Sequence, residues 1–244
     1  MTAPELDLLA FGPHPDDVEL AVGGTLALAA RQGKRVGIVH LTGGETGTRG
    51  TAAERRREAE RAADVLGAAV MEILDCGDGG LRTGPAEEDR LIELLRRYRP
   101  DLVFGPPPRD RHPDHGRAHD LVEAACFYAG VGKRRPDLGE PFRPAVTYQY
   151  MLHDPFRPDF VVDVTAVWEI RQRAVAAYRS QVYLEDEERE EPVTKISSQD
   201  FWHAVAGRAR HYGNLVGATF GEPFTARLPL AVAAPWDLVP HGIR

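Results

Sequence analysis

The sequence predicts an α/β fold in which a Rossmann-like, mostly parallel sheet carries helices on both faces. Two observations support this prediction. Short apolar or β-branched runs alternate with longer runs of helical periodicity, and the alternation occurs four times before Gly130. Consecutive strand-and-helix units of this kind form parallel sheets through right-handed crossovers. Such sheets bind their ligands beyond the carboxyl ends of the strands.

Local composition predicts the bounds of the four strand-and-helix units. Asp7–Phe11 is apolar and ends before a Gly-Pro pair, and Val18–Gln32 has the Ala and Leu content of a buried helix. Val36–Leu41 is β-branched, and Ala52–Leu66 is charged on one face and apolar on the other. The remaining strands and helices of this half are Val70–Leu74, Glu87–Tyr98, Leu102–Phe104 and Arg117–Tyr128.

The pattern changes after Gly130. Two apolar segments, Val146–Leu152 and Phe160–Val164, are predicted to extend the sheet. Helices are predicted from Val167 to about Ser180 and over Ser198–Tyr212. The almost wholly charged Glu185–Glu191 is interpreted as a solvated loop, and its role as a lid is left open. We expect one domain over residues 1–244, with a core at about 5–130 and an extension at about 131–244.

Composition narrows the class of function. The chain is 43% hydrophobic and 27% charged, as in a folded globular protein, and its formal charge of −7 provides no global field for nucleic acid or an anionic membrane. Two cysteines are too few for a disulfide framework, and no stretch near the N-terminus is long enough to span a membrane. A cytoplasmic protein is expected.

Two histidine-rich loops carry the predicted chemistry. His14-Pro15-Asp16-Asp17 follows the first strand, and Asp110-Arg111-His112-Pro113-Asp114-His115 follows the fourth. Imidazole and carboxylate suit Zn²⁺ and related divalent ions, and a catalytic zinc uses three protein ligands and an open position for water. His14, Asp17 and His115 would supply those ligands, which leaves Asp16 as the base that deprotonates the water.

The other members of these loops have supporting roles in this hypothesis. Asp114 or Asp110 would accept a ring N–H from a histidine and fix its tautomer, and His112, charged by such a partner, would stabilise an oxyanion or protonate the leaving nitrogen. A single His-Pro-Asp is usually only a helix-capping turn, but two copies at equivalent strand ends favour a site. Each of the remaining histidines is interpreted as structural or exposed.

Substrate recognition is predicted from arginines. Arg55 follows the second strand's loop and would clamp a substrate carboxylate with two hydrogen bonds, while Arg109 and Arg111 add positive charge beside the second histidine loop. The glycine-rich Thr42–Thr51 matches neither common phosphate-binding fingerprint, so nucleotide binding is not expected.

These motifs closely resemble those of the LmbE-like/PIG-L family of zinc-dependent N-acetylglucosamine deacetylases. The resemblance rests on Phe11–Glu19, Gly43–Thr51 and Asp110–His115, and it runs nearly end to end. Three further segments indicate the bacillithiol-biosynthesis branch more weakly: Tyr148–Met151, Ala177–Gln181 and Gly207–Gly217. That branch removes acetate from N-acetylglucosaminyl malate to give glucosaminyl malate.

The resemblance implies roles for individual residues. His14, Asp17 and His115 correspond to metal ligands and Asp16 to the general base. His112 corresponds to the histidine that stabilises the tetrahedral intermediate, paired with an aspartate such as Asp114. Arg55 occupies the position that grips the substrate's acid group. Zn²⁺ or Fe²⁺ is the implied ion, and homo-oligomers, often hexamers, are the implied assembly.

Pro13 departs from the alanine that the family usually has before its histidine, which stiffens the loop without removing a ligand. No tyrosine aligns with the acid of the mycothiol branch, so the leaving-group acid is open. Two alternatives to the malate conjugate remain: another N-acetylglucosamine conjugate, of mycothiol or inositol type, and a metal-stabilised sugar-binding module without turnover.

Overall fold

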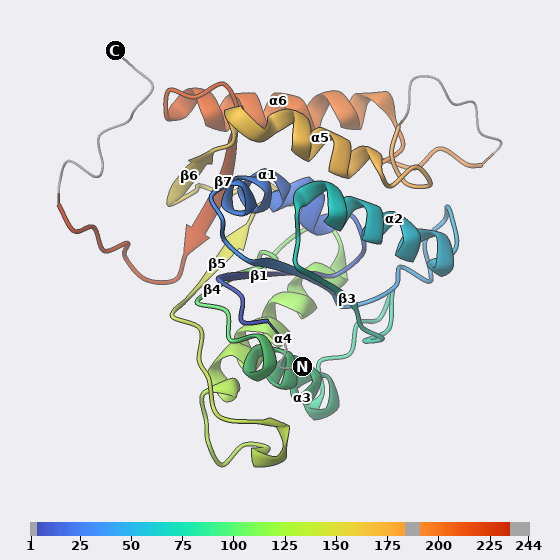
Figure 1. Ribbon diagram of the computed structural model, residues 1–244. Coiled ribbons are helices and arrows are strands. Elements are labelled where there is room, and N and C mark those ends of the chain that lie inside the picture. Colours follow the sequence, from blue (N-terminus) through green and yellow to red (C-terminus); the bar gives the residue numbers. More distant parts are fainter. Residues whose placement is uncertain (1–3, 184–190, 235–244) are drawn as a thin grey trace.

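The protein is built around a seven-stranded sheet with the strand order β3-β2-β1-β4-β5-β7-β6 (Figure 1). The computed structural model describes residues 4–183 and 191–234. Strands β1 to β5 run parallel to their neighbours, and β7 runs antiparallel to both β5 and β6. The predicted α/β class with a mostly parallel sheet is therefore confirmed.

Four strand-and-helix units form the first half. Their bounds are β1 Leu8–Gly12, α1 Asp17–Arg31, β2 Val36–His40, α2 Ala52–Leu66, β3 Val70–Ile73, α3 Pro85–Tyr98, β4 Leu102–Gly105 and α4 Pro113–Ala129. The second half comprises η1 Pro136–Leu138, β5 Val146–Tyr150, β6 Phe160–Asp163, η2 Thr165–Val167, α5 Trp168–Ala176, α6 Gln199–Leu215 and β7 Gly221–Ala226.

Three elements differ from the sequence-based expectation. Helix α4 begins at Pro113 rather than Arg117, because proline fits the first helical turn and His112 caps it, so the second histidine motif lies on a helix N-terminus rather than in a loop. Strand β7 is absent from the sequence-based expectation, since Gly221 and Pro223 interrupt a strand pattern. Helix α5 ends at Ala176, earlier than Ser180. Residues 185–190 of the charged loop lie outside the described residues.

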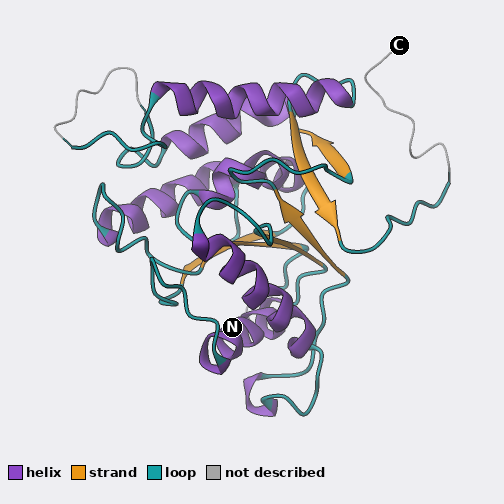
Figure 2. Ribbon diagram, turned by 180° about the vertical axis from the view of Figure 1, so that it is seen from behind, coloured by secondary structure: helices purple, strands orange, loops and turns teal. Residues whose placement is uncertain are grey.

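Helices cover both faces of the sheet. Helices α3 and α4 pack on one face, and α1 and α2 pack on the other, where α5 packs on α1 and α2 and α6 packs against the strands β7 and β6 (Figure 1). Figure 2 shows the same layers from behind. A separate buried apolar cluster fills each side of the sheet. Within the described residues, no helix combines the length and apolar content needed to cross a bilayer.

The strand order places one particular pair of loops together. From β1 the chain adds β2 and β3 on one side of the sheet and then returns to add β4 on the other side of β1. The parallel strands β1 and β4 are therefore hydrogen-bonded neighbours although they are far apart in the sequence. The loops that follow two such strands diverge and leave a crevice at the carboxyl edge. The His14 and His112 loops are these two loops, so the topology itself creates their juxtaposition.

The second half of the chain is bonded directly to α1. The buried carboxylate of Glu222 on β7 accepts hydrogen bonds from the backbone N–H groups of Gly24 and Thr25, at 2.8 and 2.7 Å, and from the Thr25 hydroxyl at 2.6 Å. Buried Arg171 on α5 donates to the Leu20 carbonyl at 2.6 Å. The helix that begins at Asp17 is thus held by charged groups from the C-terminal half.

Glu222→Ala should reduce the free energy of unfolding by about 2 kcal/mol or more, because it leaves buried donors of α1 without an acceptor. Glu222→Gln should lose less, since its amide oxygen still accepts. Urea unfolding followed by circular dichroism measures both, with Glu60→Ala, an exposed change on α2, as a control. Equal losses in the Gln and Ala variants would contradict the hydrogen-bonding explanation.

Candidate metal centre

The β1–α1 turn brings His14 and Asp17 together. The Asp17 Oδ2 atom accepts the backbone N–H of His14 at 3.0 Å and lies 3.1 Å from the His14 Nδ1 atom. Both residues are buried. Between them, Asp16 has a φ of 106°, in the left-handed region that a residue with a Cβ rarely adopts. This unusual backbone turns successive carboxylates in different directions.

Helix α4 supplies the remaining imidazoles. His115 lies in its first turn, is buried, and places its Nε2 atom 3.5 Å from Asp17 Oδ2. His112 is the N-cap residue, and its Nδ1 atom accepts the backbone N–H of Asp114 at 3.2 Å. The rings of His14 and His112 meet edge to face, with centroids 4.7 Å apart. The two loops therefore converge as the sequence predicts.

Buried carboxylates orient both imidazoles of the predicted ligand set. Asp110 pairs with His115 Nδ1, which leaves His115 Nε2 directed to Asp17. On the other ring, the Nε2 atom of His14 lies 3.1 Å from Asp78 Oδ1 and 3.6 Å from Asp114 Oδ2, while Nδ1 faces Asp17. Carboxylates placed behind imidazoles in this way select the tautomer and ring orientation that metal binding requires.

The donor atoms fit a divalent ion. Ligand bonds of about 2.0–2.2 Å at tetrahedral angles separate two donor atoms by about 3.4 Å, close to the 3.1 and 3.5 Å found around Asp17 Oδ2. His14, His112 and His115 also offer nitrogens within 4.8 Å of one another, as do the donor atoms of His14, Asp78 and Asp114. The set His14, Asp17 and His115 remains our prediction, because Asp78 and Asp114 have other hydrogen bonds.

Charge at the site favours a cation. Burial lowers the pKa of His14, but the carboxylates of Asp114, Asp17 and Asp78 more than offset this and raise it well above its ordinary value. The neighbouring imidazoles of His115 and His14 overcome the effect of burial on Asp17 and depress its pKa. The site therefore contains more carboxylates than positively charged groups, and a bound divalent ion would neutralise the excess negative charge.

Asp16 differs from its neighbours. Its Oδ2 atom is buried without a hydrogen-bond partner and lies 3.6 Å from Arg55 Nη2. Burial raises the pKa of Asp16 to about 7, against the opposing effect of the Arg55 charge. A carboxylate with an available oxygen and a pKa near neutrality has the properties of a general base.

Arg55 lies in the site but is occupied by protein groups. Its guanidinium donates to the Pro15 and Gly44 carbonyls and is itself buried. In this arrangement Arg55 joins the β1–α1 turn to the loop that follows β2, and its positive charge lies beside Asp16. Arg55 also lines the cavity, and its Nε atom is buried without a hydrogen-bond partner, so the two-bond grip on a substrate carboxylate stays a prediction.

His112 does not pair with the Asp114 carboxylate as expected, whereas the expected aspartate–imidazole pair is formed by Asp110 and His115. The Asp114 carboxylate is turned away to accept the Gly79 and Leu81 N–H groups and an Arg117 hydrogen bond. Burial lowers the pKa of His112, as do the nearby His14 and His115 charges. Because its Nδ1 atom accepts a backbone hydrogen, a neutral His112 carries its proton on Nε2 and acts there as a donor.

A cavity of about 250 Å³ opens over these groups. Arg111 lines it, whereas Arg109 is exposed and is not among the lining residues. The complete lining is His14, Asp16, Asp17, Thr46, Gly47, Thr48, Arg55, Asp78, Arg111, His112, His115, His153, Gln181, Thr194, Lys195 and Ile196.

Sequence reasoning misses two titratable residues of the site that follow strands of the parallel sheet. Asp78 follows β3, and His153 follows β5 and stacks on His115 with ring centroids 5.7 Å apart. Interpreting His153 as structural or exposed overlooks its position beyond a strand of the same parallel sheet. The carboxyl-edge rule that finds His14 and His115 applies to both residues and would have found them.

Comparison with known proteins identifies the family. The model of the PIG-L family, described as GlcNAc-PI de-N-acetylase, matches residues 9–126, which include both histidine motifs. A 1D-myo-inositol 2-acetamido-2-deoxy-alpha-D-glucopyranoside deacetylase of Saccharopolyspora erythraea is 30% identical over 226 residues, covering 71% of this chain and 82% of the relative. The chain belongs to the PIG-L family.

Other relatives show the range of activities among similar sequences. A diacetylchitobiose deacetylase of Thermococcus kodakarensis is 29% identical over 226 residues, covering 88% of this chain and 80% of the relative. A 4-oxalmesaconate hydratase of Pseudomonas putida is 31% identical over 201 residues, covering 75% and 77%. Among solved structures, a conserved protein of Thermus thermophilus has a TM-score of 0.84 and 39% identity, covering 95% of this chain and 98% of that one.

We expect one divalent ion per chain, and His14→Ala or His115→Ala should abolish its binding. Asp110→Ala should weaken binding by about 10–100-fold, because His115 loses the carboxylate that orients it. Metal content by inductively coupled plasma mass spectrometry and affinity by chelator competition measure these effects. The exposed Asp64→Ala serves as a control, and undiminished metal content in the histidine variants would refute the ligand assignment.

Proposed function

We propose that the protein removes an N-acetyl group from an N-acetylglucosamine conjugate by metal-dependent hydrolysis. The observation that carries this proposal is the free, buried Oδ2 atom of Asp16 beside a donor set of two imidazoles and one carboxylate. Membership of a deacetylase family supports the same reaction. Zn²⁺ is the ion we propose, and Fe²⁺ suits the same ligands.

A divalent ion in this site supplies Lewis acidity, which polarises the acetamide carbonyl and makes water more acidic. Asp16 accepts the proton that the attacking water loses. His112 donates from Nε2 to the oxygen on which negative charge develops. As the C–N bond breaks, Asp16 returns its proton to the leaving nitrogen, so that water and amide become acetic acid and amine, which exchange a proton to give acetate and an ammonium group.

The tyrosines near the site are poor alternatives for the leaving-group acid. Tyr148 and Tyr150 are not among the residues that line the cavity. The buried Tyr150 hydroxyl donates to the Phe11 carbonyl at 2.7 Å, and burial raises its pKa further. We therefore assign the proton delivery to Asp16, with His112 as the alternative donor.

We propose N-acetylglucosaminyl malate as the substrate, which would place the enzyme in bacillithiol biosynthesis. The motif resemblance described above supports this choice, and so does the positive charge of Arg111 at a cavity that would otherwise receive a neutral sugar. Relatives named for inositol-linked and chitobiose substrates make other N-acetylglucosamine conjugates the in-class alternative. A single domain, a cytoplasmic location and a homo-oligomer, such as a hexamer, remain predictions.

Metal-loaded protein should release acetate from N-acetylglucosaminyl malate faster than from N-acetylglucosamine, diacetylchitobiose or an inositol-linked analogue. Mass spectrometry of each sugar before and after incubation measures the loss of the acetyl group. Because a hydratase is also among the relatives, 4-oxalmesaconate belongs in the panel. Hydration of that compound without any deacetylation would overturn the proposal, and complete inactivity would favour a binding module.

Asp16→Asn should lower kcat for deacetylation by about 10²–10⁴-fold, because an amide cannot accept the proton of the attacking water. Metal content should be unchanged, since the predicted ligands remain. Asp64→Asn, an exposed change of the same chemistry on α2, should leave both quantities unaltered. An Asp16→Asn variant with near-normal kcat would rule out this base.

A further inference from the structure

His40 is a completely buried imidazole at the end of β2, beside the first histidine loop. The other residues of this strand are apolar or glycine. Burial of a polar ring costs free energy unless its nitrogens find hydrogen-bond partners. One nitrogen of His40 has such a partner, since its Nδ1 atom lies 3.2 Å from the carbonyl oxygen of His14, a predicted metal ligand.

The two ring nitrogens of His40 are not equally satisfied. A carbonyl oxygen can only accept, so Nδ1 carries the hydrogen and donates it to His14. The Nε2 atom has no hydrogen-bond partner among the described residues and lies 3.8 Å from Glu19 Oε1, which accepts the Tyr178 hydroxyl at 3.0 Å. An unpartnered buried nitrogen is costly. A phenylalanine ring would fill a similar space without this cost, so packing alone does not account for the imidazole.

The bond from His40 belongs to a series along the β1–α1 turn. Four consecutive carbonyls, those of residues 12–15, each accept a hydrogen bond from the end of β2, from the loop after it or from α2. The donors, in the order of the carbonyls, are Leu41 N–H at 2.8 Å, Thr42 N–H at 3.1 Å with its hydroxyl at 2.9 Å, His40 Nδ1 at 3.2 Å and the Arg55 guanidinium. The neighbouring strand and helix thus hold every peptide group of the turn.

The His14 peptide is the one whose orientation affects the ligands most directly. Its N–H donates to Asp17 Oδ2 at 3.0 Å, and its carbonyl accepts the Asp17 N–H in a longer bond of 3.3 Å. Asp16, between them, has a φ of 106°, a conformation that persists only where the surrounding structure enforces it. Without His40 the carbonyl would keep only the longer bond. Rotation of this peptide would then displace both ligands and the proposed base together.

We propose that His40 is a positioning residue of the metal centre, whose Nδ1–H fixes the His14 carbonyl and thereby the donor atoms of His14 and Asp17. This inference rests on the predicted ligand set and on the proposed function. His40 acts through the backbone, because it is not among the residues that line the cavity. It therefore extends the centre to a residue of β2 that touches neither the substrate nor the ligand side chains.

Three substitutions of His40 separate its donor from its volume. In His40→Asn the amide nitrogen occupies nearly the place of Nδ1 and can still donate to the His14 carbonyl. In His40→Gln the amide lies near the place of Nε2, and His40→Phe keeps a ring without any donor. The Gln and Phe variants should bind Zn²⁺ about tenfold or more weakly than the wild-type protein, and the Asn variant should bind nearly as well. Chelator competition measures the affinities.

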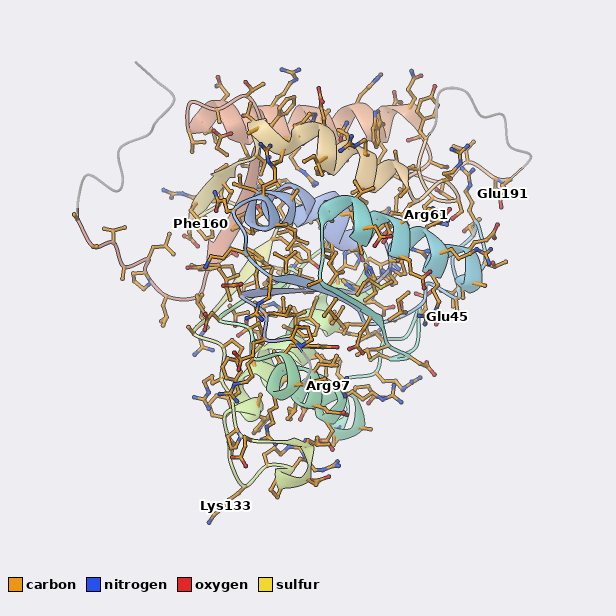
Figure 3. The ribbon with its side chains drawn as sticks, in the orientation of Figure 1. Glu45, Arg61, Arg97, Lys133, Phe160 and Glu191 are labelled. Carbon is orange, nitrogen blue, oxygen red and sulfur yellow. The ribbon has the colours of Figure 1, made fainter. Side chains whose placement is uncertain are left out.

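The comparison of Asn with Gln excludes a merely structural role. Asparagine removes more volume than glutamine, so packing alone would make His40→Asn the weaker binder, whereas the positioning role makes it the stronger one. Val39→Ala is the control for stability: it removes buried volume from the same strand on the face covered by α3 and α4, and should lower stability to urea without changing Zn²⁺ affinity. Lys133→Ala, an exposed change at the lower end of the molecule in Figure 3, should alter neither.

The steady-state kinetics provide a second measurement. At saturating Zn²⁺, His40→Phe should lower kcat for N-acetylglucosaminyl malate by about 10–100-fold, because Asp16 moves with the turn. KM should change little, since no residue that lines the cavity is replaced. His40→Asn should recover most of kcat. A change in KM alone, with kcat per bound ion unaltered, would contradict the positioning role.

The outcomes separate this inference from the proposed function. If the wild-type protein binds Zn²⁺ and deacetylates its substrate while all three His40 variants bind Zn²⁺ equally well, the inference is overturned and the proposed function stands. Equal losses in the Asn, Gln and Phe variants overturn it too. If the wild-type protein binds Zn²⁺ but deacetylates nothing, weaker binding by the Phe and Gln variants and recovery in Asn support the inference although the proposed reaction fails. If the wild-type protein binds no divalent ion, both fail.

Discussion

The Asp17 carboxylate is the interaction on which the site depends. A single oxygen caps the backbone of the first histidine loop, faces the His14 ring and faces the His115 ring from α4. The two imidazoles come from loops that are far apart in the chain, and the reversal of strand order between β1 and β4 brings them within reach of this one atom. If either strand shifted, the donor atoms would no longer share a common centre.

Burial of these charged groups costs folding free energy, and it also leaves reactive atoms in the site without hydrogen-bond partners. Charged groups in a low-dielectric environment destabilise a fold unless each has a partner, and the site satisfies most of them with backbone N–H groups, hydroxyls and one another. Asp114 is held by Gly79 and Leu81, and Asp78 is held by Thr46. Three atoms on residues that line the cavity, His14 Nε2, Asp16 Oδ2 and Arg55 Nε, have no hydrogen-bond partner among the described residues, although His14 Nε2 lies 3.1 Å from Asp78 Oδ1.

Inner and outer charges have different roles. Arg55 and the carboxylates around His14 are engaged by protein groups, so they set geometry and local potential. Arg111 and Lys195 line the same cavity but are exposed, in contrast to the buried Arg55.

The sequence by itself determined the strand-and-helix alternation, the two histidine loops at the carboxyl edge and the residues His14, Asp16, Asp17 and His115 as one cluster. These features follow from local periodicity and from the general geometry of parallel sheets. Local patterns could not show that Asp114 turns away from His112, that Arg55 is bonded to carbonyls, or that Lys195 joins the cavity. Those facts depend on which buried donors and acceptors meet across the sheet. Only the tertiary structure decides them, because each hydrogen bond satisfies groups that are far apart in the chain.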